Sequence, residues 1–235
     1  MIESRSSRTK FPVGFPIDNW NPAVTPPRTT IFGAWCHVEP LNVEIHGNTL
    51  YEAFAKNKNA ELWTYLPYGP FENIGDFKNW IKKNCLGSDP LFHAIIEPHT
   101  KRALGVASYL RINQDVGVIE VGHINYGSEL QQSQAGTEAM YLMMKRAFED
   151  LGYRRYEWKC DALNERSRKA ATRLGMTFEG VFRQATIYKN RNRDTAWYSI
   201  LDHEWPHMKK AFEKWLAPAN FSTNGQQICH LHDFI

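Results

Sequence analysis

Residues 120–175 read EVGHINYGSELQQSQAGTEAMYLMMKRAFEDLGYRRYEWKCDALNERSRKAATRLG, and this stretch decides the fold. Its pattern predicts a strand, a loop, a helix, a second strand and a second helix. The loop at 131–136 consists of small and polar residues and leads directly into the helical run that begins at Thr137. The first N–H groups of a helix lack partners, and the helix dipole favours negative charge there. The stretch therefore predicts a site for a phosphate-bearing ligand.

Strand and helix patterns continue along the rest of the chain. Alternating apolar residues predict strands, and apolar residues at helical spacing predict amphipathic helices. Strands are expected at 31–41, 91–96, 103–110, 118–126, 153–161, 178–188 and 195–201, and helices at 43–56, 74–84, 137–151, 164–175 and 204–216. Short turns between the strands from 91 to 126 predict an antiparallel meander. The polar turn 189–194 predicts a hairpin.

The two ends of the chain differ from its middle. Residues 1–30 contain five prolines, which lack a backbone donor and resist helix formation, so an extended arm is expected there. Residues 31–217 carry the strand and helix patterns and are expected to form one domain. Residues 218–235 are polar with little periodicity and are expected to be a C-terminal tail.

Composition limits the class of protein. The chain has 235 residues, of which 43% are hydrophobic and 23% charged, as in soluble globular proteins. A net charge of +3 is too small to indicate nucleic acid binding by itself. The cysteines are scattered without a C-x-x-C pair, which argues against a zinc site or disulfide framework and favours free thiols in a reducing cytoplasm. No apolar run approaches the roughly 20 residues that a membrane span needs.

Five short motifs occur in a specific order: Glu120-Val121-Gly122-His123, Thr137-Glu138-Ala139, Asn164-Glu165-Arg166-Ser167, Arg173-Leu174-Gly175-Met176 and Phe178-Glu179-Gly180. Together they resemble the GNAT family of acyl-CoA N-acyltransferases, and within it the ribosomal-protein N-terminal acetyltransferases. The resemblance covers roughly residues 31–205. It implies an α/β (α+β) fold with a mixed, mostly antiparallel twisted sheet of about seven strands and helices on both faces.

The same resemblance implies a reaction and its partners. Acetyl-CoA is the expected cosubstrate. A primary amine of a protein N-terminus or of a small molecule is the expected acceptor, and it would attack the thioester directly, without a metal. A membrane partner is not expected, and nucleic acid is expected only through a ribosomal substrate. Whether the chain forms a homodimer stays open.

For the cosubstrate, the resemblance implies two binding segments. The backbone of Gln132, Ser133, Gln134, Ala135, Gly136 and Thr137 would hold the pyrophosphate. The backbone of Val121, Gly122 and His123 would bind the pantetheine arm and polarise the thioester carbonyl. The family loop usually carries two or three glycines, whereas only Gly136 remains in this chain.

Two residues at the start of the predicted helix 164–175 have two interpretations each. Asn164 is a good N-cap residue, and the resemblance adds a contact between its side-chain amide and the pantetheine arm. Ser167 lies one turn further along the helix. The resemblance makes it a candidate for protonating the leaving thiolate, while its small size also suits close packing of the helix on the sheet.

Glu120 is a candidate general base. A carboxylate in an otherwise apolar strand is costly unless it is paired or hydrated, and burial raises its pKa toward the working pH. A structural ion pair is an equally good interpretation. Alternation places Glu120 and Gly122 on one face of the strand and Val121 and His123 on the other. His123 is the rival base, although a hydrogen-bonded core histidine is favoured.

The strand 153–161 has charged side chains on one face, which is unusual for a central strand. This face predicts an open cleft in which Glu157 or Asp161 attracts a cationic amine. An internally paired charged face is the alternative. The aromatic loop 63–71 contains Tyr65 and Tyr68, which are expected either in the wall of the acceptor pocket or as a plug for the core.

Two further functions remain open from the sequence. A CoA-binding sensor or pseudoenzyme would bind the cosubstrate without turnover. A ribosome- or RNA-binding protein would use the basic turn 189–194, and its binding would weaken steeply with salt.

Overall fold

The computed structural model describes residues 5–6, 11–55 and 60–235. Eight strands form one sheet in the order β3-β4-β5-β6-β7-β8-β10-β9. Neighbouring strands are antiparallel except β7 and β8, which run parallel. The prediction of a mixed, mostly antiparallel sheet is confirmed, with one strand more than expected. The arm of the chain adds a separate two-stranded hairpin, β1-β2.

The elements have the following bounds. The strands are β1 Arg5–Ser6, β2 Pro12–Val13, β3 Ile31–Phe32, β4 His37–Pro40, β5 Leu91–Ile96, β6 Ala103–Asn113, β7 Val118–Tyr126, β8 Arg155–Asp161, β9 Thr177–Tyr188 and β10 Arg191–Leu201. The α-helices are α1 Val43–Ala55, α2 Ile74–Asn84, α3 Gln134–Lys145, α4 Glu165–Arg173 and α5 Trp205–Leu216. Short helical turns are η1 Ala60–Trp63, the π-helical η2 Arg146–Asp150, η3 Pro218–Asn220 and η4 Leu231–Phe234. The helix expected over 43–56 agrees with α1 up to Ala55; Lys56 lies outside the described residues.

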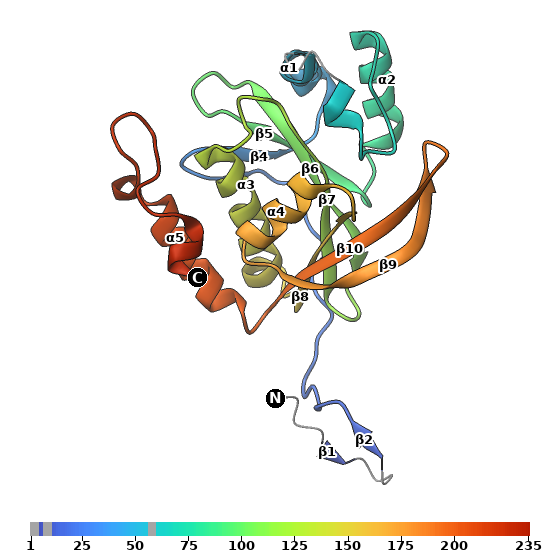
Figure 1. Cartoon of the computed structure of the whole chain (residues 1–235), viewed down its shortest axis with the longest axis vertical. Coiled ribbons are helices and arrows are strands. Elements are labelled where there is room, and N and C mark those ends of the chain that lie inside the picture. Colours follow the sequence, from blue (N-terminus) through green and yellow to red (C-terminus); the bar gives the residue numbers. More distant parts are fainter. Residues whose placement is uncertain (1–4, 7–10, 56–59) are drawn as a thin grey trace.

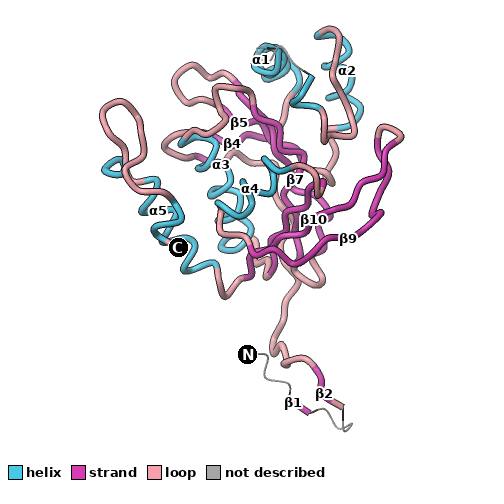
Figure 2. Tube along the Cα trace, in the orientation of Figure 1, coloured by secondary structure: helices cyan, strands magenta, loops and turns pink. Residues whose placement is uncertain are grey.

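Helices cover both faces of the sheet (Figure 1). Helices α1 and α2 lie over one end of β5 and β6, while α3, α4 and α5 lie on the opposite face. The hairpin β9-β10 extends from the other end of the sheet and curls toward the α1-α2 side, and the tube view gives the same arrangement (Figure 2). Part of the sheet face between α2 and this hairpin is thus not covered by a helix.

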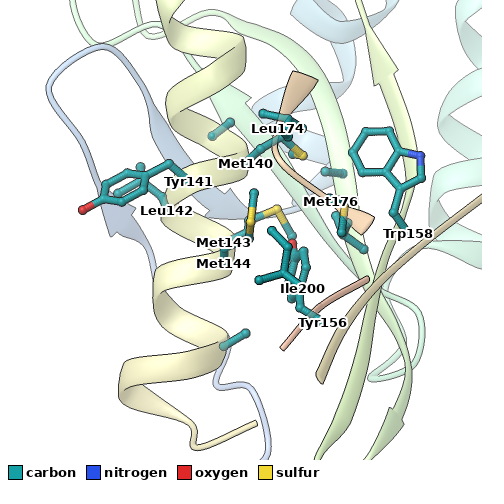
Figure 3. Packing of buried hydrophobic residues seen from close by; sticks show 14 of the residues in the cluster. Met140, Tyr141, Leu142, Met143, Met144, Tyr156, Trp158, Leu174, Met176 and Ile200 are labelled. Atoms are coloured by element: carbon teal, nitrogen blue, oxygen red, sulfur yellow. The ribbon is translucent and has the colours of Figure 1, made fainter. Parts of the chain in front are cut away.

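Two apolar cores lie on the two faces. On the α3 side, methionines of α3 meet side chains of β8, of β10 and of the segment that follows α4 (Figure 3), including Met140, Met143, Met144, Tyr156, Leu174, Met176 and Ile200. Methionine adapts its shape and fills irregular gaps, which suits the junction of several elements. The smaller core joins α1 and α2 to β5 and β6 and includes Phe54, Trp63, Phe77 and Phe92.

The strand expected over 31–41 is two strands, β3 and β4, joined by a tight turn. Glu138 of α3 causes this break. Its buried carboxylate accepts hydrogen bonds from the backbone N–H groups of Ala34 (2.9 Å), Trp35 (2.6 Å) and Cys36 (2.8 Å). At Gly33 an added Cβ would overlap this carboxylate. The turn is therefore built around a charge more than 100 residues away in the sequence.

The hairpin β9-β10 has a shorter turn than the predicted 189–194. Only Lys189 and Asn190 separate the two strands, and both have positive φ, 47° and 57°. Two consecutive left-handed residues match the twist of a two-residue hairpin. Polar composition alone overestimated the loop, because Arg191 to Asp194 belong to β10.

The arm and the tail both contact the domain. In the arm, Trp20 Nε1 donates to the carbonyl of Asp115 at 2.7 Å, whereas Phe11 and Phe15 are exposed. Residues 1–4 and 7–10 of the expected arm lie outside the described residues. In the tail, Leu231 is buried against the α3-side core and Asn220 Nδ2 donates to the carbonyls of Trp215 and Cys229. None of the helices in the described ranges is long and apolar enough to span a bilayer.

Acid should destabilise the protein through His93. This side chain of β5 is fully buried, and burial lowers its pKa from 6.5 to about 4. Between those values the unfolded chain binds a proton that the folded chain does not, so stability falls as the pH decreases through this window. We expect His93 to account for a loss of about 2 kcal/mol between pH 7 and pH 5 in urea unfolding. His93→Leu should reduce this pH dependence, whereas the exposed control His203→Gln should not; equal slopes in all three proteins would contradict the assignment.

Candidate active site

Strands β7 and β8 separate near the middle of the sheet. Their parallel pairing runs from Val118–Arg155 to Val121–Trp158, yet the strands continue to Tyr126 and Asp161. At the point of separation β7 has a bulge. Ser108 of β6 pairs with Gly122 but Val106 pairs with Asn125, so β7 contains one extra residue there. Bulges bend a strand and release it from its ladder, which leaves backbone groups of both strands available to an extended ligand between them.

The bulge changes the predicted faces of β7. His123 has φ of 50°, and its ring packs against Tyr68 and Phe92, which lie on the α1-α2 side. The Glu120 carboxylate lies on this side too, since its neighbours along the strand, Ile119 and Val121, are packed in the core on the α3 side. The prediction that Glu120 and His123 lie on opposite faces is therefore wrong. Simple alternation holds up to Gly122 and fails where the extra residue is inserted.

The loop before α3 has the geometry of an anion site despite its few glycines. Ser133 caps the helix: its Oγ accepts from the N–H of Gly136 at 3.0 Å and donates to the carbonyl of Leu130 at 2.7 Å. Within the described residues, the N–H groups of Gln134 and Ala135 have no acceptor. Thr137 is buried, with its Oγ1 donating to the carbonyl of Ser133. The first turn of α3 thus presents free amides next to the β7-β8 separation.

Two positions explain how the loop keeps this shape. A Cβ at Gly136 would lie 2.5 Å from the carbonyl oxygen of Leu130, so the one remaining glycine is required by close backbone approach. Gln132 adopts φ of 55°, a left-handed conformation that favours glycine. Glutamine adopts this conformation at a modest cost in free energy, in a loop that carries more glycines in the family.

This cost predicts the effect of two substitutions. Gln132→Gly should leave the free energy of unfolding unchanged or raise it by up to about 1 kcal/mol, whereas Gln132→Val should lower it by about 1–2 kcal/mol, because β-branched residues resist positive φ. Urea unfolding measures both. A Gln132→Gly protein that is less stable than the Val variant would contradict a backbone cost at this position, because only valine resists positive φ.

An arginine that sequence reasoning missed lies beside this loop. Nη2 of Arg173, near the end of α4, donates to Thr137 Oγ1 at 2.6 Å. Its guanidinium also lies over the ring of Trp215, 5.6 Å from the centroid. From the tail, the carbonyl of Gly225 accepts from Gln134 Nε2 at 3.2 Å. The tail and a cation therefore border the free amides of α3, and no local sequence signal indicated either contact.

Glu120 is buried and held by two cations. Oε1 lies 2.7 Å from Nη1 of Arg111, and Oε2 lies 2.9 Å from Nζ of Lys159. Burial raises the pKa of Glu120, while Lys159 and Arg111 act in the opposite direction. The carboxylate is thus both an ion-pair partner and a group whose proton affinity is increased, and it lies next to the bulge.

The charged side chains of β8 are engaged with protein partners. Both oxygens of Glu157 are paired, Oε1 with Arg155 Nε at 2.6 Å and Oε2 with Lys159 Nζ at 2.7 Å. Asp161 is also buried, with Oδ1 accepting from the N–H of Leu163 and Oδ2 from the hydroxyl of Tyr188. Among the described residues, these contacts fit the internally paired interpretation of this face.

Lys159 is the centre of this charge network. It lies between Glu120 and Glu157, and its Nζ lies 3.7 Å from the ring centroid of Trp197 on β10. A buried ammonium needs such partners to remain charged. The network fixes the Glu120 carboxylate in position. Its side-chain contacts join β7, β8 and β10, so the sequence of a single strand could not predict them.

His123 is a neutral side chain in this environment. Its Nδ1 is 3.1 Å from the hydroxyl of Tyr68. Burial lowers its pKa to about 4, with smaller contributions from the charges of Arg111 and Arg193. At neutral pH the ring can accept a proton or a hydrogen bond, but it does not carry positive charge.

The start of α4 is organised as the sequence predicted. Asn164 caps the helix, its Oδ1 accepting from the N–H of Ser167 at 3.1 Å. Trp158, at the last β7-β8 pair, donates its indole N–H to Ser167 Oγ at 3.0 Å. The Ser167 hydroxyl thus accepts from Trp158, and it also hydrogen-bonds to the thiol of Cys160 on β8.

The aromatic loop 63–71 and the β9-β10 hairpin meet across the uncovered sheet face. Nζ of Lys189 donates to the carbonyl of Trp63 at 2.7 Å. The hydroxyl of Tyr65 donates to the carbonyl of Leu163 at 3.1 Å, and Tyr68 contacts His123. Trp63 and Tyr68 also line a small apolar cavity between α2 and the sheet. Tyr68 thus packs against the core, as one of the two interpretations expects, and its place in the wall of the acceptor pocket stays a prediction.

The structure brings most predicted site residues together around the β7-β8 separation. His123, Glu120, Ser167, Asn164 and Tyr68 surround it, and the loop 132–137 lies at the start of the neighbouring helix. Glu157 and Asp161 are nearby but engaged with protein partners. Among the described residues, no group of three or more His, Cys, Asp or Glu side chains is arranged to hold a metal ion.

Comparison with known proteins identifies the class. A sequence model described as the acetyltransferase (GNAT) domain matches residues 42–177. A GCN5-related N-acetyltransferase from Brucella melitensis is 42% identical, with a TM-score of 0.91 over 93% of this chain and 99% of its own. A probable GNAT-family acetyltransferase from Chromobacterium violaceum is 38% identical, with a TM-score of 0.77 over 85% of this chain and 100% of its own. The chain belongs to the GNAT acetyltransferase family, whose members use acetyl-CoA as acetyl donor.

A more distant match bears on the expected subgroup. A putative ribosomal-protein-serine acetyltransferase from Vibrio cholerae has a TM-score of 0.62 at 17% identity, over 73% of this chain and 97% of its own. At this identity the match shows the fold alone. No curated protein matches the chain at a significant level. Membership of the ribosomal-protein subgroup therefore remains a prediction.

Proposed function

We propose that the protein transfers the acetyl group of acetyl-CoA to a primary amine by direct attack. The observation that carries this proposal is the β7-β8 separation, which lies beside the free amides of α3 and next to the buried carboxylate of Glu120. An extended thioester would lie between the strands with its pyrophosphate at residues 132–137. Asn164 would hold the arm through its remaining amide donors.

The residues around the bulge would each perform one part of the reaction. Backbone N–H groups near Val121, Gly122 and His123 would polarise the thioester carbonyl. Glu120 would take the proton from the ammonium, directly or through water, so that the amine attacks the carbonyl carbon. As the C–S bond breaks, the hydroxyl proton of Ser167 would go to the leaving thiolate, and the proton that the attacking nitrogen loses would restore the serine hydroxyl. Holding both reactants together supplies much of the rate.

The alternative of RNA binding through the hairpin receives less support. Of the cations between 189 and 194, Lys189 bonds to the Trp63 carbonyl, and the Nε of Arg193 is buried. Arg191 is exposed. A surface for phosphate backbones needs several exposed cations. Acetylation of a ribosomal protein also stays a prediction. A homodimer is a separate prediction, which size-exclusion chromatography would test.

An acetyl-CoA thermal shift followed by a thiol-release screen tests the proposal. Saturating acetyl-CoA, at about 100 times its Kd, should raise the Tm by roughly 5–10 °C. A panel of amines should then contain acceptors that release free thiol. A thermal shift with no turnover on any amine would support the sensor alternative. No shift with acetyl-CoA would contradict both.

A reducing compartment is part of the proposal. All four cysteines are free thiols, and Cys36, Cys85 and Cys160 are buried. Burial raises the pKa of each of these three thiols, so they remain protonated and unreactive.

A further inference from the structure

Arg193 is a cation without a protein partner at the mouth of the proposed acceptor site. It lies on β10, three residues after the hairpin turn, and is partly buried. Within the described residues it forms no ion pair, and its buried Nε has no hydrogen-bond acceptor. Its guanidinium carbon lies 5.9 Å from the ring centroid of Tyr188. An unsatisfied buried donor is costly, so such a group is informative when it faces a site.

Its neighbours place the guanidinium near the β7-β8 separation. The ring of Tyr188 is fixed by the hydrogen bond from its hydroxyl to Asp161 at the end of β8, 2.8 Å long. The charge of Arg193 is close enough to lower the pKa of His123 on β7 and to act on Cys160 of β8. Arg193 is therefore near both strands where they separate, on the side of the hairpin.

The carboxylates in this region are already engaged. Glu120 is held by Arg111 and Lys159, and Glu157 by Arg155 and Lys159. Asp161 accepts from the Leu163 N–H and the Tyr188 hydroxyl. None of these three carboxylates pairs with Arg193. The region thus offers an unpaired guanidinium, rather than an unpaired carboxylate, to an incoming molecule.

We propose that Arg193 binds an anionic oxygen group, a carboxylate or a phosphate, of the acceptor. This inference rests on the proposed function and names its substrate class: an amine that carries such a group close to its nitrogen. A guanidinium suits this role because its planar donors match two oxygens of a carboxylate or phosphate. The inference replaces the expectation that Glu157 or Asp161 attracts the acceptor through its ammonium group.

Paired acceptors test this inference. Phosphoethanolamine is compared with ethanolamine, and β-alanine with β-alaninamide, so that each pair differs in the anion and the two pairs distinguish phosphate from carboxylate. For the preferred anion, kcat/KM should be at least about 10-fold higher than for the neutral member. Arg193→Gln should lower it about 10- to 100-fold through KM, and leave the neutral acceptor and the KM for acetyl-CoA unchanged. Arg191→Gln, on the same strand but exposed, is the matched control.

Calorimetric binding of the same four amines to the CoA-loaded protein separates this inference from the proposed function. Binding of an anionic amine that Arg193→Gln weakens, without turnover, would support the inference and contradict acetyl transfer. Turnover that favours neutral amines, or an equal effect of Arg193→Gln on both members of each pair, would overturn the inference and leave acetyl transfer intact. Arg193→Lys should recover part of the preference for the anion, and a Tm equal to the unsubstituted protein confirms that the variants are folded.

Discussion

Glu120→Gln should lower kcat about 100- to 1,000-fold while the KM for acetyl-CoA changes little. The carboxylate is buried beside the bulge of β7, and burial raises its pKa, so that it binds a proton more readily than an exposed glutamate. The amide cannot accept the proton of the ammonium, and a positioned base typically contributes this much to the rate. Steady-state thiol release with the best acceptor measures both constants.

Glu157→Gln is the matched control for this variant. Both glutamates are buried on neighbouring strands and both pair with Lys159, at 2.9 Å and 2.7 Å. Each substitution therefore removes one partner of the same ammonium, but only Glu120 lies next to Gly122 and the bulge. If Glu157→Gln lowers kcat as much as Glu120→Gln, the loss comes from the charge network and Glu120 is not the base. His123→Gln would then test the rival base.

Glu138→Gln should have the largest effect on stability. The carboxylate accepts three backbone hydrogen bonds from the turn between β3 and β4, and it is buried. An amide offers one oxygen and places an NH₂ group against backbone donors. We expect a loss of about 3 kcal/mol and a Tm lower by roughly 6–12 °C.

The control for this substitution lies on the neighbouring helix. Glu213 of α5 is exposed and accepts one hydrogen bond, from the hydroxyl of Tyr141 on α3. Glu213→Gln should lower the free energy of unfolding by less than about 1 kcal/mol. Calorimetry at neutral pH compares the two variants. Equal Tm values would show that the turn at 33–36 does not depend on the charge of Glu138.

Local signals predicted much of the fold. Helix α2 begins and ends where expected, because Asn73 caps it through a bond from the N–H of Asp76, and apolar residues such as Phe77 and Ile81 follow at helical spacing. Strand β5 is a short apolar run with buried residues throughout. The position of Asn164 as a cap was also correct. Each of these features depends on residues within a few positions of one another.

The features that the sequence missed depend on contacts between distant segments. The break between β3 and β4 is made by Glu138, more than 100 positions away. The bulge at His123 is a shift in pairing with β6, and it reverses the side-chain face that alternation predicts. Glu157 is paired by Lys159, whose ammonium is buried against the ring of Trp197 on β10. The positions of the Arg173 and Arg193 side chains depend on their neighbours in the fold, which no local sequence pattern predicts.

The most direct test of the central claim is a single-turnover experiment with the protein in excess over acetyl-CoA. Direct attack at the β7-β8 separation predicts that free thiol appears only after an amine is added, at a rate that Glu120→Gln lowers. Intact-mass spectrometry of the protein before the amine is added should show no acetylated species. Release of thiol without an amine, together with an acetylated protein that later passes its acetyl group to the acceptor, would contradict direct attack.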